Sequence, residues 1–148
     1  GNSGKVQGGG QTVVSPAAYE TVIAVAATDP LDLRAPFSST GPEVELAAPG
    51  VPILAPTIGG GYGQFAGTSC ACPHVSGVAA LLMAYFPELG AAEVKEVLLE
   101  SAVRYGGRNT ALPGEPGTVV PFDSLSATGS VVNAYEAVRR ALGGVQDR

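Results

Sequence analysis

The chain has 148 residues, a formal net charge of −5, and 45% hydrophobic against 14% charged residues. This length and low charge allow one modest domain with a buried core and exclude a disordered segment. Basic residues form no clusters, so nucleic acid and anionic membranes are not expected as partners. The apolar run from Val75 to Phe86 is shorter than the roughly 20 residues that span a bilayer, and it indicates a buried core helix.

The first part of the sequence predicts loops and short strands. Residues 1–11 are rich in glycine and are expected to form a loop. Val22 to Ala27 is a continuous apolar run with β-branched residues, which indicates a strand buried on both faces. A short strand is predicted around Val44 to Leu46. Another is predicted at Val51 to Ala55, where Pro52 restricts it to a sheet edge.

The second part predicts three helices and two glycine-rich connections. Ser69 to Tyr85 is apolar on nearly every side, which predicts a central buried helix. Ala91 to Ala102 is amphipathic, and one face carries Val94, Val97, Leu98 and Ser101. The third helix is predicted at Val131 to Leu142, with helical spacing of Val131, Ala134, Tyr135 and Val138. Residues 59–63 are expected to be a flexible lead, and residues 106–129 a long surface loop. Strands that alternate with helices predict an α/β fold around a parallel sheet.

The most informative stretch is residues 67–77, Gly-Thr-Ser-Cys-Ala-Cys-Pro-His-Val-Ser-Gly, at the start of the first predicted helix. It places Ser69 in the first helical turn, where N–H groups lack partners and the helix dipole is positive. A serine there can attack a carbonyl while nearby N–H groups stabilise the oxyanion. An ordinary serine N-cap is the alternative, and position alone does not separate the two.

Every fixed position of this run matches the serine motif of the subtilisin-like serine proteases, G-T-S-x-A-x-P-H-V-x-G, and the chain resembles that family. Further segments resemble the family in the same order: Gly1-Asn2 and residues 19–27, 37–42, 48–51 and 131–138. The resemblance implies a three-layer α/β/α sandwich with a mainly parallel sheet. Residues 1–148 would be the C-terminal portion of one catalytic domain.

The resemblance also assigns roles to individual residues. It implies a serine endopeptidase that hydrolyses peptide bonds through an acyl-enzyme at Ser69. Asn2 would donate from its side-chain amide to the oxyanion, although an asparagine beside glycine is also an ordinary turn residue. Gly1, Gly67 and Thr68 would border the bound substrate. The family's triad runs in the order Asp, His, Ser, so the aspartate and the base histidine would lie upstream and be absent from these residues.

His74 is the one histidine of the sequence. On the predicted helix it lies about 140° round from Ser69, a poor position for a base. The matching family residue is structural, so a packed helix residue is expected. Cys70 and Cys72 have the residue types of a zinc site, but their side chains would diverge by about 200°. We therefore expect two buried free thiols and no metal at these residues.

The resemblance implies two partners, a polypeptide substrate and the N-terminal part of the same domain, and a secreted or periplasmic location. No cofactor is required by the chemistry. In some relatives a structural Ca²⁺ or Na⁺ binds weakly at backbone carbonyls, and the counterparts here would be Ala17, Tyr19 and Val22 with Glu43 or Glu45; the alternative is that these acids are simply solvated. Because the chain lacks a base, it is expected to be inactive alone. The alternatives are a non-catalytic or complementing subtilase-like module, and an oxidant-sensing thiol protein built on the two cysteines.

Overall fold

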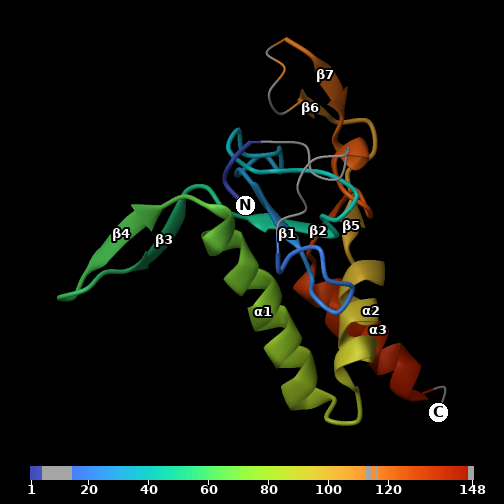
Figure 1. Cartoon of the computed structure of the whole chain (residues 1–148). Helices are drawn as coiled ribbons and strands as arrows, with labels where there is room; N and C mark the ends of the chain where they lie inside the picture. Colours follow the sequence, from blue (N-terminus) through green and yellow to red (C-terminus); the bar gives the residue numbers. More distant parts are fainter. Residues whose placement is uncertain (5–14, 113–114, 116, 147–148) are drawn as a thin grey trace.

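The fold is described from a computed structural model, which covers residues 1–4, 15–112, 115 and 117–146 (Figure 1). Its main sheet has the strand order β1-β2-β8-β5. The strands are β1 (Val25–Thr28), β2 (Leu46–Pro49), β8 (Ser130–Val131) and β5 (Val103–Arg104). The first three pair in parallel, and β5 pairs antiparallel with β8. Short apolar and β-branched runs of this kind suit a sheet that is covered by helices.

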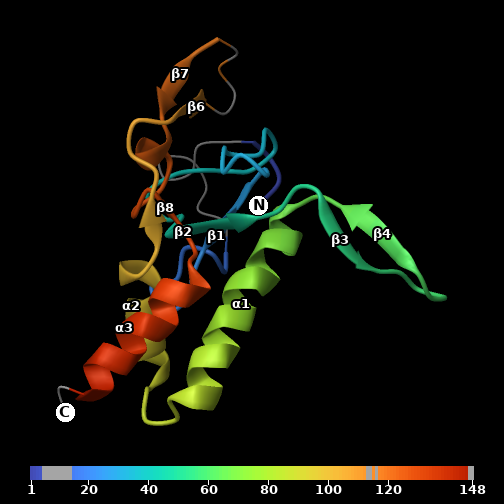
Figure 2. The same cartoon turned by 180° about the vertical axis from the view of Figure 1, so that it is seen from behind.

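Three helices lie together below the sheet in both views (Figures 1 and 2). They are α1 (Thr68–Tyr85), α2 (Ala91–Glu100) and α3 (Ala134–Gln146). Helix α1 packs on β1 and β2, and all three helices contact one another. Their shared core includes the fully buried Leu46, Leu82 and Leu98. A mainly parallel sheet packed against helices confirms the predicted α/β class, and the amphipathic pattern of α2 is confirmed by its buried Val94 and Leu98.

A hairpin of β3 (Ile53–Pro56) and β4 (Tyr62–Phe65) projects from the body and leads into α1 (Figures 1 and 2). Its tip, Gly59 to Gly61, has three glycines with φ values of 88°, 95° and 87°, which side-chain-bearing residues rarely adopt. The strand predicted at Val51 to Ala55 is confirmed as β3, which begins after Pro52 at Ile53 and lies at the edge of a two-stranded sheet. The prediction that residues 59–63 form a flexible lead is wrong for Tyr62 and Gly63, which belong to β4.

The prediction of a long surface loop at 106–129 is wrong. Strands β6 (Asn109–Ala111) and β7 (Val119–Pro121) form a second hairpin there, followed by the 3-10 helix η1 (Phe122–Leu125). Phe122 and Leu125 are only 4% and 6% exposed. Strands of three residues are too short to show an alternating pattern, and the glycines and prolines around them hide the hairpin.

The prediction that α1 is buried all round is also wrong. In α1 only Ala71, Val75 and Leu82 are buried, and Leu81, Met83 and Tyr85 are 38%, 53% and 74% exposed. One side of the helix packs on β1, β2 and the other helices, and within the described part of the chain nothing covers the rest. No helix among these residues is long and apolar enough to cross a membrane.

Helix α3 begins three residues later than predicted. Val131 belongs to β8, and Asn133 Oδ1 accepts a hydrogen bond from Glu136 N at 3.0 Å. An asparagine that bonds to the third residue of a helix is an N-cap, and it sets the start of α3 at Ala134. The sequence predicts Tyr135 on the apolar face, but this residue is 72% exposed, whereas Ala137 and Ala141 face the core. The buried face of α3 therefore differs from the predicted one.

Candidate active site

Ser69 lies in the first turn of α1, and hydrogen bonds place that turn beside the ends of the parallel strands. Gly67 N donates to Gly50 O at 3.0 Å, and Gly50 N donates to Thr28 O at 2.9 Å. A Cβ on Gly50 would stand 2.6 Å from Ala27 Cβ, so only glycine allows this close approach. The serine is therefore held by the backbone at the carboxyl ends of β1 and β2, where α/β folds commonly place their sites.

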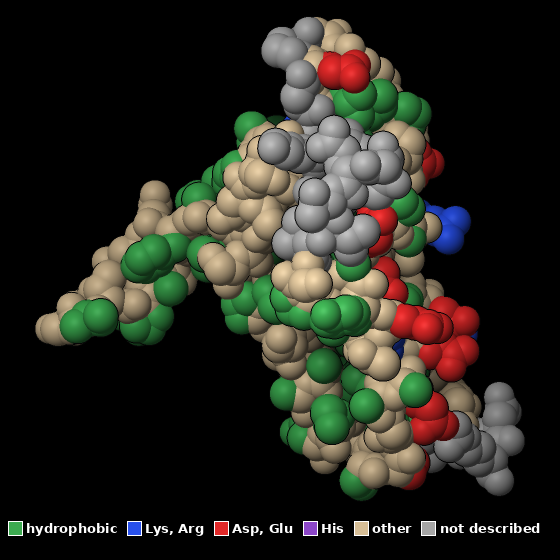
Figure 3. Space-filling view, viewed as in Figure 1, with side chains coloured by type: hydrophobic (Ala, Val, Ile, Leu, Met, Phe, Trp, Pro, Cys, Tyr) green, Lys and Arg blue, Asp and Glu red, His purple; other side chains and the backbone are tan. Residues whose placement is uncertain are grey.

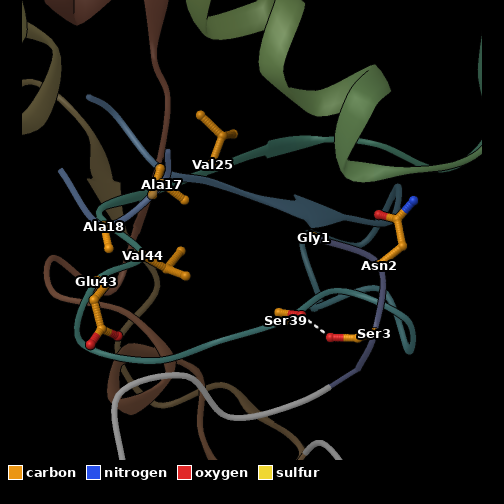
Figure 4. Close-up of a pocket in the computed structure, with 10 residues that line it drawn as sticks. Gly1, Asn2, Ser3, Ala17, Ala18, Val25, Ser39, Glu43 and Val44 are labelled. Carbon is orange, nitrogen blue, oxygen red and sulfur yellow. Dashed lines mark hydrogen bonds between the residues drawn. The ribbon is translucent and has the colours of Figure 1, made fainter. Parts of the chain in front are cut away.

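The segment that carries Asn2 is held by a neighbouring turn. Gly4 N donates to Phe37 O at 2.8 Å and Ser39 N donates to Gly1 O at 2.9 Å. The Ser3 and Ser39 hydroxyls are 3.0 Å apart (Figure 4). These three contacts order residues 1–4 along the turn at 37–39.

Asn2 is joined to the start of α1 through its side chain. Its Oδ1 accepts hydrogen bonds from Thr68 N at 2.9 Å and Thr68 Oγ1 at 2.7 Å. The amide oxygen is thus occupied, while the Nδ2 donor has no acceptor among the described residues. Sequence reasoning placed Thr68 beside the substrate and missed this anchoring contact, which joins residues 66 positions apart.

The absent side chain of Gly67 leaves space beside both predicted site residues. A Cβ on Gly67 would lie 3.0 Å from Ser69 Oγ, 3.3 Å from Asn2 Nδ2 and 3.7 Å from Ser69 N. A hydroxyl oxygen and two N–H nitrogens therefore lie within 3.7 Å of this Cβ position. The structure brings together Ser69 and Asn2, with Gly67 and Thr68 between them.

Arg34 is a buried residue that sequence reasoning missed. Its Nη1 donates to Ala35 O, Pro36 O and Ser38 O at 2.8, 2.9 and 2.8 Å, and its Nη2 donates to Ala111 O at 3.0 Å. Burial lowers the pKa of the Arg34 guanidinium. Its hydrogen bonds stabilise the turn at residues 35–39, and this turn bonds to residues 1–4. An arginine between apolar residues, in Leu33-Arg34-Ala35, was the available signal.

Two pockets flank the site. One, of about 340 Å³, has Gly1 and Asn2 at one end and Glu43 and Val44 at the other (Figure 4). The second, of about 320 Å³, lies between the β3–β4 hairpin and the start of α1, and Phe65 and Ser69 line it. Ser69 therefore borders an open depression between the hairpin and α1.

Among the described residues, the His74 ring bonds to its own helix and not to Ser69. It is exposed, and its Nδ1 lies 2.9 Å from Cys70 O, which accepts a hydrogen bond from the ring. The ring is bound to its own helix, so the prediction of a packed residue is wrong about its burial. Cys70 and Cys72 are free, but Cys70 is half-buried and Cys72 is exposed, which corrects the expectation of two buried thiols. In the parts of the chain that are described, no three His, Cys, Asp or Glu residues gather as metal ligands.

Two of the oxygens predicted to bind Ca²⁺ or Na⁺ contact a cationic side chain. Val22 O accepts a hydrogen bond from Lys95 Nζ at 3.1 Å, and Glu45 Oε1 lies 2.8 Å from the same nitrogen. A metal ion at these oxygens would be close to a like charge, which is unfavourable. In this arrangement Val22 O and Glu45 Oε1 are ligands of the Lys95 ammonium.

Comparison with known proteins identifies the relatives of this architecture. The family model described as "Subtilase family" matches residues 1–135. Subtilisin DY from Bacillus licheniformis is 43% identical over 106 residues, covering 72% of this chain and 38% of that protein. Subtilisin E from Bacillus subtilis (strain 168) is 44% identical over 109 residues, covering 74% of this chain and 28% of that protein.

Two solved structures are similar over nearly the whole chain. The self-cleaved protease domain of PatA is 30% identical with a TM-score of 0.72, over 97% of this chain and 48% of that one. The prenylagaramide maturation protease PagA is also 30% identical with a TM-score of 0.76, over 95% and 48%. The chain thus spans about half of these structures and a smaller share of the curated relatives.

Proposed function

The chain belongs to the subtilase family, and from this membership we propose that it carries the nucleophile-bearing part of a serine endopeptidase site. In this proposal Ser69 Oγ attacks the carbonyl carbon of a peptide bond, and the amine product leaves from an acyl-enzyme that water then hydrolyses. The observation that carries the proposal is that Ser69 Oγ, Ser69 N and Asn2 Nδ2 all lie within 3.7 Å of the position that a Cβ on Gly67 would take.

Asn2 and the first turn of α1 would stabilise the oxyanion. The Ser69 N–H belongs to a helix start, where N–H groups have no intrahelical acceptor. Asn2 Oδ1 is held by Thr68, so its Nδ2 is oriented before substrate arrives. Donors that are already in place need no reorganisation during the reaction, which is how oxyanion holes lower a barrier. Gly1, Gly67 and Thr68 would border the substrate.

Ser69 needs a base that would come from outside residues 1–148. The sequence has one histidine, and its ring contacts the carbonyl of Cys70. We propose that the missing Asp and His belong to an N-terminal part of the same domain. Without this part the hydroxyl has no proton acceptor, and the chain alone would be nearly inactive.

Exposed apolar surfaces support such a partner. The β3–β4 hairpin presents Leu54, Ile58 and Tyr62, which are 67%, 107% and 74% exposed. Hydrophobic side chains also lie over α1 (Figure 3). Contiguous exposed apolar surface marks interaction sites, and we propose that the N-terminal part covers it. Polypeptide substrates and a secreted or periplasmic location are proposed from the family alone.

A fluorophosphonate probe tests this function, because it reacts with activated serines. We expect labelling at Ser69, located by peptide mapping, when the chain is joined to or mixed with the preceding segment of its polypeptide. The Ser69→Ala variant and the chain alone should stay unlabelled.

The other outcomes separate the alternatives. A stable assembly that remains unlabelled would contradict the protease proposal and support a non-catalytic or complementing module. Labelling of the chain alone would contradict the need for an added base.

A further inference from the structure

A lysine on α2 reaches a group of oxygens just before β1. Lys95 Nζ lies 2.5 Å from Glu20 O, 3.1 Å from Val22 O and 2.8 Å from Glu45 Oε1. The Lys95 and Glu45 side chains are 20% and 22% exposed. An ammonium group has three N–H donors and no acceptor, so these three oxygens match its hydrogen-bonding capacity.

These oxygens are also the kind that bind hard metal cations, which take carbonyl and carboxylate ligands. We propose that the Lys95 ammonium is the resident cation of this site and replaces a bound Ca²⁺ or Na⁺. The inference concerns the structural support of the chain and does not rest on the proposed role of Ser69. It disagrees with the expectation of a weakly bound metal at Val22 and Glu45.

Lys95 joins three separate parts of the chain. Tyr19 O accepts a hydrogen bond from Val22 N at 2.9 Å, which closes a turn, and Lys95 binds two carbonyls of that turn from α2. Glu45 then connects the ammonium to the approach to β2. Residues 17 and 18 line the pocket that also contains Asn2 (Figure 4). The lysine thus supports one wall of that pocket whatever the metal concentration.

A second carboxylate, Glu43, precedes Glu45 by two residues. Glu43 Oε2 and Glu45 Oε2 are buried and have no hydrogen-bond partner among the described residues. Lys95 balances the charge of Glu45, whereas Glu43 lines the pocket. Glu43 is therefore the other carboxylate at which a metal would bind, and a test must separate binding at Glu43 from binding at the oxygens that Lys95 contacts.

The test compares Lys95→Met with Lys95→Arg in the complete polypeptide, on a Ser69→Ala background that prevents self-digestion. Thermal unfolding is followed while CaCl₂ or NaCl replaces choline chloride at constant ionic strength. We expect the parent protein and Lys95→Arg to show no saturable response. Lys95→Met should unfold at least roughly 2–4 °C lower and regain this loss as Ca²⁺ or Na⁺ saturates the vacated oxygens.

Removing the carboxylate provides the matched control. Lys95→Met with Glu45→Gln should lose the metal response, because the charged oxygen ligand is gone. If Lys95→Met folds only when Ca²⁺ is present, the proposal is supported. A saturable response of the parent protein to Ca²⁺ or Na⁺ would overturn it, and loss of that response in Glu43→Gln would place the metal at Glu43. A Lys95→Met variant indifferent to both cations would overturn it as well.

Discussion

Replacing Asn2 with alanine is expected to lower kcat of the assembled enzyme by about 10²–10³-fold, a magnitude known for removing one oxyanion donor in subtilisin itself. KM should change much less, because the lost hydrogen bond forms mainly in the transition state. The geometry supports this expectation, since Asn2 Nδ2 and Ser69 Oγ lie 3.3 and 3.0 Å from the position that a Cβ on Gly67 would take. Steady-state hydrolysis of a peptide substrate measures the effect.

Thr68→Val provides the control for anchoring. It removes the hydroxyl that donates to Asn2 Oδ1 at 2.7 Å but keeps the Thr68 N–H bond at 2.9 Å. Asn2 should then be less firmly oriented, and kcat should fall by less than in Asn2→Ala. An Asn2→Ala enzyme with unchanged kcat would contradict the oxyanion role while leaving the nucleophile untested by this measurement.

The start of α1 could be predicted because its signals are contiguous. Residues 67–77 contain the glycine, the hydroxyl and the apolar run of one helix beginning, and the structure starts α1 at Thr68. The contact between Asn2 and Thr68 spans 66 positions. No local pattern determines such a pairing, and only the family resemblance placed both residues in one site.

Other features escaped prediction for reasons of chemistry. A lysine on an amphipathic helix normally extends into solvent, and nothing near Lys95 indicates that it reaches carbonyls 73 and 75 positions earlier. The burial of α1 was overestimated, because an apolar sequence shows that a helix can be covered and not which segment covers it. Leu81 and Met83 stay exposed among the described residues for this reason.

Replacing Arg34 with methionine is expected to destabilise the protein by at least about 3 kcal/mol. The change removes the Arg34 donor from the carbonyls of Pro36, Ser38 and Ala111, while Ala35 O keeps its bond from Ser38 N. Each buried unsatisfied group costs about 1–3 kcal/mol. Chemical denaturation of the Ser69→Ala background measures the loss. Arg104→Met is the matched control, because Arg104 is exposed, and it should change the free energy of unfolding little.

Arg34 should also affect catalysis through Asn2. Arg34 stabilises the turn whose Phe37 O and Ser39 N bond to residues 1–4. A substitution less disruptive than Arg34→Met should therefore leave the protein folded but shift the Asn2 amide. Arg34→Lys keeps the charge but lacks the planar donor fork that reaches both Ser38 O and Ala111 O. We expect it to lower kcat more than it raises KM when Asn2 is present, and to have little further effect in Asn2→Ala. Equal losses of kcat in both backgrounds would show that Arg34 acts independently of Asn2 and would contradict this prediction, because coupled residues give non-additive effects and independent ones do not.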